Sequence, residues 1–266
     1  MATIVFFHAH PDDEVTTTGG TIARLAAEGH RVVLVTATRG ELGEVPEGLL
    51  AEGEALPDRR VEELAESCRV LGVARQVFLG YNDSGMAGED SNESPGAFAA
   101  ADVDEAARLL AGILDDESAD VLVAYDEHGG YGHPDHVMVH RVGLRAAELA
   151  GTHRVFMATV DRTYLKGLIP SVQGTGLEVT PEMTAMFETI GVPGTRVTTE
   201  IDVRGYLDVK RSALRAHASQ IGDTGFFLAM PDDVFTAVWG NEWYVRVKPE
   251  TASDGTAGTR EPSLLG

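Results

Sequence analysis

Short apolar runs alternate with amphipathic segments over the first 160 residues of the chain. The apolar runs predict strands at 3–8, 31–37, 75–79, 119–125 and 154–158. Segments whose apolar residues recur every three or four positions predict helices at 12–28, 58–71, 101–117 and 134–149. This alternation is typical of repeated strand–helix–strand units. We therefore expect an α/β fold with three layers, in which helices cover both faces of a mostly parallel sheet.

The pattern is less regular beyond residue 160. It predicts short helices at 161–168 and 181–190, a strand at 196–202, a helix at 204–218 and a last strand at 242–247. Pro231, followed by two aspartates, indicates one more helix start. We expect a single α/β domain over residues 1–248. Residues 249–266 show neither periodicity nor apolar content, and we expect them to form a flexible tail.

Long polar loops follow three of the predicted strands, at 39–57, 80–100 and 126–133. In doubly wound sheets, ligands bind outside the carboxyl ends of the strands, so these loops predict a site at that edge. The place of a dinucleotide-binding G-x-G-x-x-G after the first strand is taken by "HAHPDDE". We find no P-loop and no G-x-S-x-G elbow. The expected fold is therefore Rossmann-like without a nucleotide-binding motif.

The chain is strongly acidic, with 42 Asp and Glu against 21 Lys and Arg and a formal charge of −21. Nucleic acids and anionic membrane surfaces attract clustered basic residues, so we expect neither as a partner. The sequence has no apolar run of about 18 residues and no signal-peptide pattern, so we expect a cytoplasmic protein without membrane insertion. The single cysteine, Cys68, lies on an apolar helical stripe and is expected to be a core residue.

Two clusters carry most of the candidate chemistry, "HAHPDDE" at 8–14 and "GGYGHPDH" at 129–136. Each cluster alone is also compatible with a helix start, because proline and acidic residues are favoured there. Together they place two pairs at three-residue spacing after two strands of one sheet, namely His10 with Asp13 and His133 with His136. Imidazole and carboxylate groups from two such loops form a three-ligand metal site with an open position, which is typical of catalytic zinc. The same ligands also suit Fe(II).

The two clusters resemble motifs of the PIG-L or LmbE-like superfamily, whose zinc-dependent N-deacetylases remove acetyl groups from N-acetylglucosamine units. The similarity extends to "TRGELGE" (38–44), "RVEELAESCRVLGV" (60–73), "LGYNDSGMAG" (79–88) and "KRSALRAHASQ" (210–220). The middle segments are most similar to the actinobacterial branch that serves mycothiol. That branch contains the N-acetylglucosaminyl-inositol deacetylase and the mycothiol conjugate amidase.

By matching position, the resemblance implies that His10, Asp13 and His136 bind zinc. It also implies that Asp12 is the general base and that His133 stabilises the oxyanion. This assignment is chemically coherent, because zinc with three protein ligands activates water and polarises a carbonyl group. Asp12 lies beside a ligand and is available to take a proton from the water.

Asp135 and Tyr131 lie in the second cluster, where we expect Asp135 to keep His133 protonated and Tyr131 to offer a phenolic donor. The resemblance also implies a substrate-binding set, namely Glu41, Arg60, Asp83, Met86 and His217. The residues themselves leave other roles open. Arg60 also suits a surface charge and Asp83 a turn residue, whereas His217 is expected to pack back onto the site from its helix.

Three further ionisable residues near the motifs are expected to support the site. His8 precedes His10 by two residues, and we expect it to pack beside the site or contact a ligand. Glu14 suits either a helix-terminal charge or a hydrogen-bond acceptor for the site. His140 lies one turn beyond His136 and is expected to be solvated or to support that ligand.

We therefore predict a metal-dependent amidohydrolase, with one Zn²⁺ per chain, that removes the acetyl group from an N-acetylglucosamine-containing small molecule. Within this class, a mycothiol S-conjugate amidase and a deacetylase of a glycosylated natural product are alternatives. A non-haem Fe(II) enzyme on the same three ligands and a non-catalytic sugar-binding protein are alternatives from other classes. The expected partner is a small amino-sugar conjugate. The sequence leaves open a homo-oligomer and a metal other than zinc, such as Fe²⁺.

Overall fold

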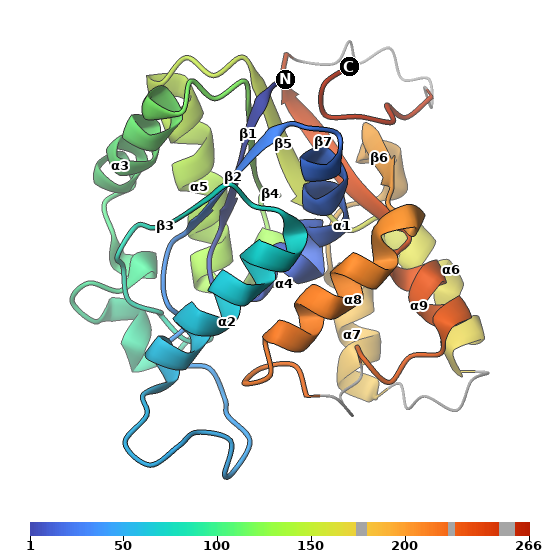
Figure 1. The fold of residues 1–266 in the computed structure, drawn as a ribbon, viewed down its shortest axis with the longest axis horizontal. Helices are drawn as coiled ribbons and strands as arrows, with labels where there is room; N and C mark the ends of the chain where they lie inside the picture. Colours follow the sequence, from blue (N-terminus) through green and yellow to red (C-terminus); the bar gives the residue numbers. More distant parts are fainter. Residues whose placement is uncertain (174–179, 223–226, 250–258) are drawn as a thin grey trace.

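The computed structural model describes residues 1–173, 180–222, 227–249 and 259–266. Within these ranges the strands form a seven-stranded sheet in the order β3-β2-β1-β4-β5-β7-β6 (Figure 1). The strands are β1 (Thr3–His8), β2 (Arg31–Thr36), β3 (Arg75–Phe78), β4 (Val121–Tyr125), β5 (Arg154–Thr159), β6 (Thr199–Asp202) and β7 (Asn241–Lys248). Strands β1 to β5 pair in parallel, whereas β7 runs antiparallel to β5 and β6.

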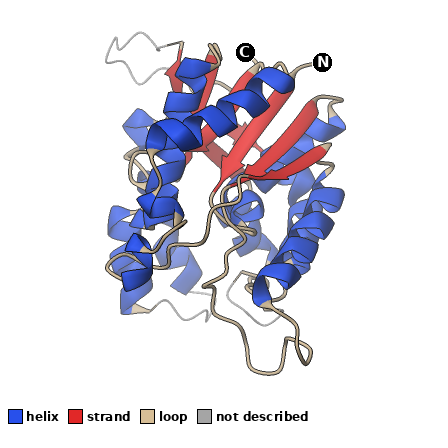
Figure 2. Cartoon of the chain, turned by 90° about the vertical axis from the view of Figure 1, so that its left-hand side faces the viewer, coloured by secondary structure: helices blue, strands red, loops and turns tan. Residues whose placement is uncertain are grey.

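Helices lie on both sides of this sheet (Figure 2). They are α1 (Asp13–Ala27), α2 (Leu56–Leu71), α3 (Val103–Asp116), α4 (Gly129–Gly132), α5 (Pro134–Leu149), α6 (Arg162–Gln173), α7 (Pro181–Thr189), α8 (Leu207–Ala216) and α9 (Asp232–Trp239). Helices α1, α2 and α8 contact one another, and α3 packs against α5. The expected α/β architecture with a mostly parallel sheet is confirmed. Among the described helices, none is long and apolar enough to cross a lipid bilayer.

The elements predicted between residues 3 and 159 form within a few residues of their expected bounds. The prediction missed α4, whose sequence "GGYG" has no hydrophobic period. Its three glycines have positive φ values of 60°, 72° and 95°, which side chains other than glycine adopt only with strain. The helix start expected at Pro231 is present, since Pro231 caps α9. The short turn of α4 is important because it lies directly before the second histidine motif.

The end of the chain differs from the flexible tail expected over 249–266. Residues 250–258 lie outside the described part of the structure. In the last eight residues, Leu264 is 1% exposed and belongs to the main hydrophobic core. Arg260 pairs with both Asp161 and Glu200, and Glu261 forms a bridge with Thr199. The expectation of a flexible tail is therefore wrong for 259–266, because one buried leucine and these pairs join this segment to the fold.

A buried ion pair connects α1, α8 and β7. The Nζ atom of Lys210 in α8 lies 2.7 Å from Oε1 of Glu242 in β7, and both residues are almost completely buried. The Glu242 carboxylate also accepts the backbone N–H groups of Gly20 and Thr21, in the middle of α1, at 2.8 Å each. Because buried charges need partners, each group of this cluster depends on the others.

Replacing Lys210 with methionine is expected to lower the free energy of unfolding by about 3–5 kcal/mol, because Glu242 would remain buried without its cation. Urea unfolding measures this change. Lys166→Met is the matched control, since Lys166 forms an exposed ion pair with Glu188 and its loss should cost less than about 1 kcal/mol. Equal costs for the two variants would show that the buried pair is not a determinant of stability.

Candidate metal centre and active site

The sheet topology brings the two histidine motifs together. The strands that precede them, β1 and β4, are hydrogen-bonded neighbours that pair in parallel. The chain continues from β1 to β2 on one side, while β4 lies on the other side of β1. This is the point where the strand order reverses, and loops at the carboxyl ends of such neighbouring strands diverge and leave room for a ligand. Both motifs begin within a few residues of these strand ends.

Three histidine rings meet at this edge of the sheet. The ring centroids of His10 and His133 are 4.7 Å apart, those of His10 and His136 are 5.3 Å apart, and those of His133 and His136 are 5.2 Å apart. All three residues are buried. One nitrogen atom from each ring lies within 4.8 Å of the others, which is a separation that one metal ion can bridge.

Asp13 connects two of these rings. Its Oδ2 atom lies 3.4 Å from His10 Nδ1, and its Oδ1 atom lies 3.3 Å from His136 Nε2. The backbone N–H of His10 also donates to Oδ2 at 2.8 Å, which orients the carboxylate. Asp13 begins α1 directly after the turn at Pro11 and Asp12. The three residues expected to bind zinc are thus adjacent, with Asp13 contacting both histidines.

The His136 ring carries a direct indication of a cation. Its Nδ1–H donates to the carbonyl oxygen of Gly129 at 3.2 Å, which leaves Nε2 as an acceptor. This Nε2 atom is buried and has no hydrogen-bond partner within the described ranges. It faces a carboxylate oxygen of Asp13 at 3.3 Å, and a neutral ring nitrogen in contact with a carboxylate is favourable only when a cation, either a metal ion or a proton, lies between them. Two imidazoles and a carboxylate are ligands that Zn²⁺ takes, so the residues fit a zinc ion.

A second group of carboxylates lies on the other side of His10. The Nε2 atom of His10 is 3.1 Å from Asp135 Oδ2 and 3.5 Å from Asp83 Oδ1. These three residues form a second group that could hold a metal ion, with one ligand atom from each lying within 4.8 Å of the others. Burial alone lowers the pKa of His10, but Asp13, Asp135 and Asp83 together outweigh burial and hold the pKa well above its usual value. The surroundings of His10 therefore stabilise positive charge.

The expected role of Asp135 requires correction. Its carboxylate accepts hydrogen bonds from the backbone N–H of Ser84 at 3.0 Å and from the Ser84 hydroxyl, and it contacts His10 rather than the His133 ring. His133 caps α5, and its Nδ1 atom accepts the backbone N–H of Asp135 at 3.2 Å. Because the cap uses the backbone of Asp135, its side chain is free to turn toward His10.

The surroundings of His133 favour a neutral imidazole over the charged ring expected from the sequence. Burial, followed by the nearby rings of His10 and His136, lowers the pKa of His133 to about 4. Its Nδ1 atom is occupied as an acceptor, so the proton of the neutral ring lies on Nε2. A neutral ring with this tautomer can still donate one hydrogen bond to a developing oxyanion.

Replacing Asp135 with asparagine is expected to weaken metal binding by about 10–100-fold, because Asp135 contacts His10, an expected ligand, and would orient its ring and increase its basicity. Competition with a metal-binding dye measures the dissociation constant. Asp233→Asn is the control, since Asp233 is exposed in the first turn of α9. An unchanged dissociation constant for Asp135→Asn would show that this contact does not support metal binding.

Asp12 occupies an unusual backbone conformation between His10 and Asp13, the two expected metal ligands of its motif. Its φ and ψ angles are 104° and −24°, and its side chain is 23% exposed. One carboxylate oxygen lies 3.4 Å from an Arg60 guanidinium nitrogen. Burial raises the pKa of Asp12 to about 6, although Arg60 opposes this shift. A carboxylate whose pKa lies close to neutrality suits a group that takes and returns a proton.

Arg60 is buried and is not the surface charge that the sequence also allowed. It is 4% exposed and donates to the carbonyl oxygens of Gly40 and Pro11. A Cβ atom at Gly40 would lie 2.2 Å from the guanidinium group, so this loop needs glycine to approach Arg60 so closely. Arg60 thus connects the loop after β2 to the turn that carries Asp12.

The other expected substrate residues divide into buried and exposed groups. Asp83 is buried and accepts the backbone N–H groups of Leu42 and Gly85, while Glu41 accepts the N–H of Asp83 at 2.9 Å. Met86 and Tyr131 are 52% and 48% exposed, and the Tyr131 ring centroid lies 4.9 Å from that of His136. The exposed pair is therefore better placed to meet a substrate than the buried Asp83 or the partly buried Glu41.

His217 and His8 are both completely or almost completely buried. The Nε2 atom of His217 lies 2.7 Å from Glu14 Oε1, so this side chain packs back onto the site from the end of α8, as expected, but presents no surface to a substrate. The ring of His8 contacts the Tyr125 hydroxyl at 2.6 Å and the Thr18 hydroxyl at 3.0 Å. His8 thus packs beside the site, as expected.

Two supporting residues were missed from the sequence. Asp126 is completely buried, accepts the N–H groups of His128 and Gly130, and receives the Thr159 hydroxyl at 2.6 Å. Ser84 donates its backbone N–H and its hydroxyl to the Asp135 carboxylate. A signal for Asp126 was present, because an acid directly after a buried strand and before two glycines suits a turn that caps its own backbone.

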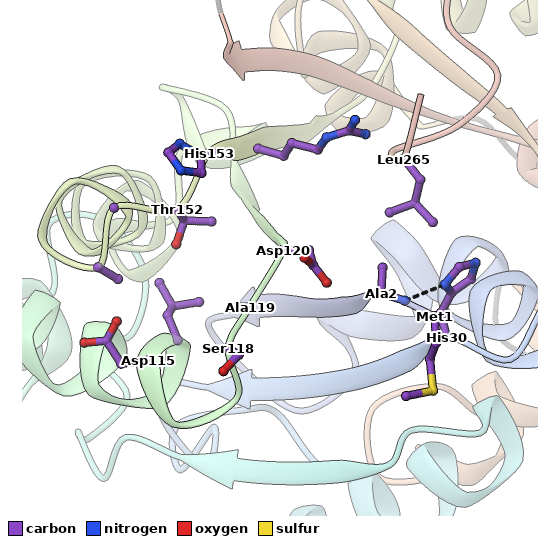
Figure 3. Close-up of a pocket in the computed structure, with 14 residues that line it drawn as sticks. Met1, Ala2, His30, Asp115, Ser118, Ala119, Asp120, Thr152, His153 and Leu265 are labelled. Carbon is purple, nitrogen blue, oxygen red and sulfur yellow. Dashed lines mark hydrogen bonds between the residues drawn. The ribbon is translucent and has the colours of Figure 1, made fainter.

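A cavity of about 600 Å³ lies at the opposite edge of the sheet, near the amino ends of β1, β4 and β5 (Figure 3). Its lining includes Ala2, His30, Asp120, Thr152 and His153. None of the residues of the two histidine motifs lines it. The cavity is thus separate from the candidate site, whose chemistry is defined by the converging side chains.

Comparison with known proteins agrees with this geometry. The family model described as PIG-L, GlcNAc-PI de-N-acetylase, matches residues 5–147, which include both histidine motifs. The chain belongs to the PIG-L family. It is accordingly a hydrolytic N-deacetylase that acts on a non-peptide amide, and the resemblance drawn from its motifs is confirmed.

Similar proteins include 1D-myo-inositol 2-acetamido-2-deoxy-alpha-D-glucopyranoside deacetylases from two organisms. The protein from Thermomonospora curvata is 42% identical, with 91% of this chain and 89% of the relative covered. The protein from Streptomyces griseus subsp. griseus is 38% identical, with 99% and 94% covered. The similarity thus extends over nearly the whole length of both proteins.

Solved structures share the fold of this PIG-L family member. An N,N'-diacetylchitobiose deacetylase from Pyrococcus horikoshii aligns with a TM-score of 0.53 and 25% identity, covering 88% of this chain and 72% of that chain. The teicoplanin deacetylase Orf2 aligns with a TM-score of 0.62 and 17% identity, covering 94% and 100%. At 17% identity the second likeness concerns the fold alone.

Proposed function

We propose that this protein is a zinc-dependent deacetylase that hydrolyses the acetamide of an N-acetylglucosaminyl-inositol. The observation that carries the reaction type is the convergence of His10, Asp13 and His136 beside Asp12 and His133 at the reversal point of the sheet. The names of relatives that are about 40% identical over nearly their full lengths support the substrate. The expected partner is a small amino-sugar conjugate.

One zinc ion per chain would be held by His10, Asp13 and His136. When bound, such an ion acts as a Lewis acid toward the amide carbonyl and makes water acidic enough to react near neutral pH. The Nε2 atom of His136, which has no hydrogen-bond partner in the described part of the chain, and the Asp13 carboxylate that it faces support this ligand set. His133 is the third imidazole of the cluster and therefore an alternative metal ligand. Metal content and turnover of a His133 variant distinguish a ligand from an oxyanion donor.

Asp12 takes the proton of the attacking water. Its carboxylate lies next to the ligand Asp13 in sequence, is partly exposed, and has a pKa raised to about 6. A base of this strength is largely unprotonated at pH 7 and can still return the proton to the leaving amine. The nearby Arg60 guanidinium, 3.4 Å away, limits how far the pKa of Asp12 rises.

His133 stabilises the negative charge that develops on the amide oxygen. The backbone N–H of Asp135 occupies Nδ1 and thereby directs the proton of the neutral ring to Nε2. A donor held in place before the reaction stabilises an oxyanion without reorganisation, and loss of one such donor usually costs about 10²–10³ in kcat. Tyr131 and Met86, exposed beside this ring and on the loop after β3, would contact the sugar or its aglycone.

The test is release of free amine from three substrate types, namely N-acetylglucosaminyl-inositol, a mycothiol S-conjugate and an acetylated glycopeptide. We expect the highest kcat/KM for the first substrate, loss of activity with a chelator and recovery with Zn²⁺. A preference for the S-conjugate would instead assign the conjugate amidase reaction. No amine from any of the three would refute the proposal. Metal analysis of protein purified with little air exposure distinguishes zinc from Fe²⁺.

A further inference from the structure

We propose that Glu14 is a positioning residue for Asp12, because its buried carboxylate holds the backbone of Asp12 in the conformation that directs the Asp12 side chain to the site. This inference rests on the proposed role of Asp12 as the base. Glu14 follows the metal-binding residue Asp13 but contacts neither His10 nor His136 through a hydrogen bond or ion pair in the described structure. Its side chain instead contacts the backbone of Asp12, the hydroxyl of Ser67 and the ring of His217.

The conformation of Asp12 requires support. Its φ of 104° is positive, a property that Asp12 shares, among the described residues other than glycine, only with Ser118. The region near φ of 104° and ψ of −24° is unfavourable for a residue with a Cβ atom and lies well away from the left-handed helical values of about 57° and 47°. Such conformations persist only where surrounding contacts impose them, and they cluster at active sites.

Glu14 supplies one of these contacts directly. Its Oε2 atom accepts the backbone N–H of Asp12 at 2.9 Å. Asp12 precedes the first residue of α1, so this N–H has no partner within the helix and is available to a side chain. The side chain of Asp12 makes no capping hydrogen bond of its own. The Asp12 carboxylate is thus not used in capping α1, while Glu14 orients the peptide unit.

The Glu14 carboxylate is itself held from two other elements. Its Oε1 atom accepts the hydroxyl of Ser67 in α2 at 2.6 Å and contacts Nε2 of His217, at the end of α8, at 2.7 Å. Glu14 and His217 are completely buried, and so is Ser67. The three groups bring α1, α2 and α8 together behind the turn. A carboxylate fixed from two helices on one oxygen is a rigid acceptor for the Asp12 amide on the other.

Kinetics separate this positioning role from a role in packing alone. Glu14→Ala should lower kcat by about 10–100-fold, because a displacement of a catalytic group by about 1 Å is enough for such a loss. KM and the bound metal should change by less than about twofold. Glu14→Gln should retain most of the activity, since its amide oxygen can accept the Asp12 N–H while its NH₂ group donates toward Ser67 and His217.

A double-mutant cycle tests whether Glu14 acts through Asp12. Adding Glu14→Ala to Asp12→Ala should lower kcat no further, because the group that Glu14 positions is already absent. Multiplied losses in the double variant, or a wild-type kcat in Glu14→Ala, would overturn the proposal. If Glu14→Ala does not fold, Glu14→Asp enters the same cycle, since it keeps the charge beside His217 but is too short to reach both partners.

A stability cycle tests the same contact without any substrate. Glycine adopts positive φ without strain, so in an Asp12→Gly background the loss of Glu14 releases no strain, and Glu14→Ala should lower the unfolding midpoint more than it does in the wild type, where relaxation of the turn offsets part of the lost contact. Equal shifts in the two backgrounds would refute the role of Glu14 in holding the strained turn. This measurement remains decisive even if none of the tested acetamides is a substrate, so failure of the proposed function and failure of this inference are distinguishable.

Discussion

Asp12→Ala is expected to lower kcat for acetamide hydrolysis by about 10²–10⁴-fold, the range typical for loss of a general base. Bound metal should stay at one ion per chain, because Asp12 contacts Arg60 and Glu14 rather than the metal-binding rings. KM should change little. Amine release gives kcat and KM, and elemental analysis of the purified variant gives the metal content.

The control for this substitution is Asp233→Ala, which removes an exposed acid from the first turn of α9. It should have wild-type kcat. Near-normal turnover of Asp12→Ala would exclude Asp12 as the base. Loss of metal together with turnover would instead indicate that Asp12 is part of the metal site. The two failures therefore lead to different corrections of the mechanism.

His136→Ala is expected to lose both metal and turnover. The His136 ring is buried, its Nδ1–H is fixed by the Gly129 carbonyl, and its Nε2 atom has no hydrogen-bond partner among the described residues. Removing this ring leaves two of the three ligands, which is too few to keep zinc against dialysis. Elemental analysis after dialysis measures the metal, and the amine assay measures the residual rate.

Two other histidines provide the comparison. His140 lies one turn further along α5 and donates to the Tyr125 carbonyl, so His140→Ala should keep its metal. His133→Ala should also keep its metal while losing about 10²–10³ in kcat, as expected for an oxyanion donor. If His133→Ala lost the metal and His136→Ala retained it, the ligand assignments of the two histidines would have to be exchanged.

The candidate site could be predicted from the sequence to the extent that its contacts are local. His10 and Asp13 are three residues apart at the start of one helix, and His133 and His136 have the same spacing at another. Strand order alone then brings these two helix starts together, since β1 and β4 are neighbours. The spacing within each motif was therefore readable from the sequence, whereas the strand order that joins the two motifs comes from the structure.

Contacts between residues distant in the sequence were not accessible in this way. Asp135 lies two residues from His133 yet pairs with His10, 125 positions away, because the α5 cap uses the backbone of Asp135 and leaves its side chain to turn. His217 reaches Glu14 across 203 positions. Each of these contacts forms because distant elements pack together in the folded chain. Hydrophobic period and residue spacing do not predict which buried groups will be adjacent.

The sequence by itself determined the α/β fold, the sheet edge that carries the site and the residues that can bind a metal. These features follow from hydrophobic period and from short-range spacing, which act before tertiary packing. Only the tertiary structure decided that burial lowers the pKa of His133, that Arg60 is buried and that Asp12 is held with positive φ. These properties arise from burial and from partners on distant elements, since desolvation and steric fit exist only in the folded chain.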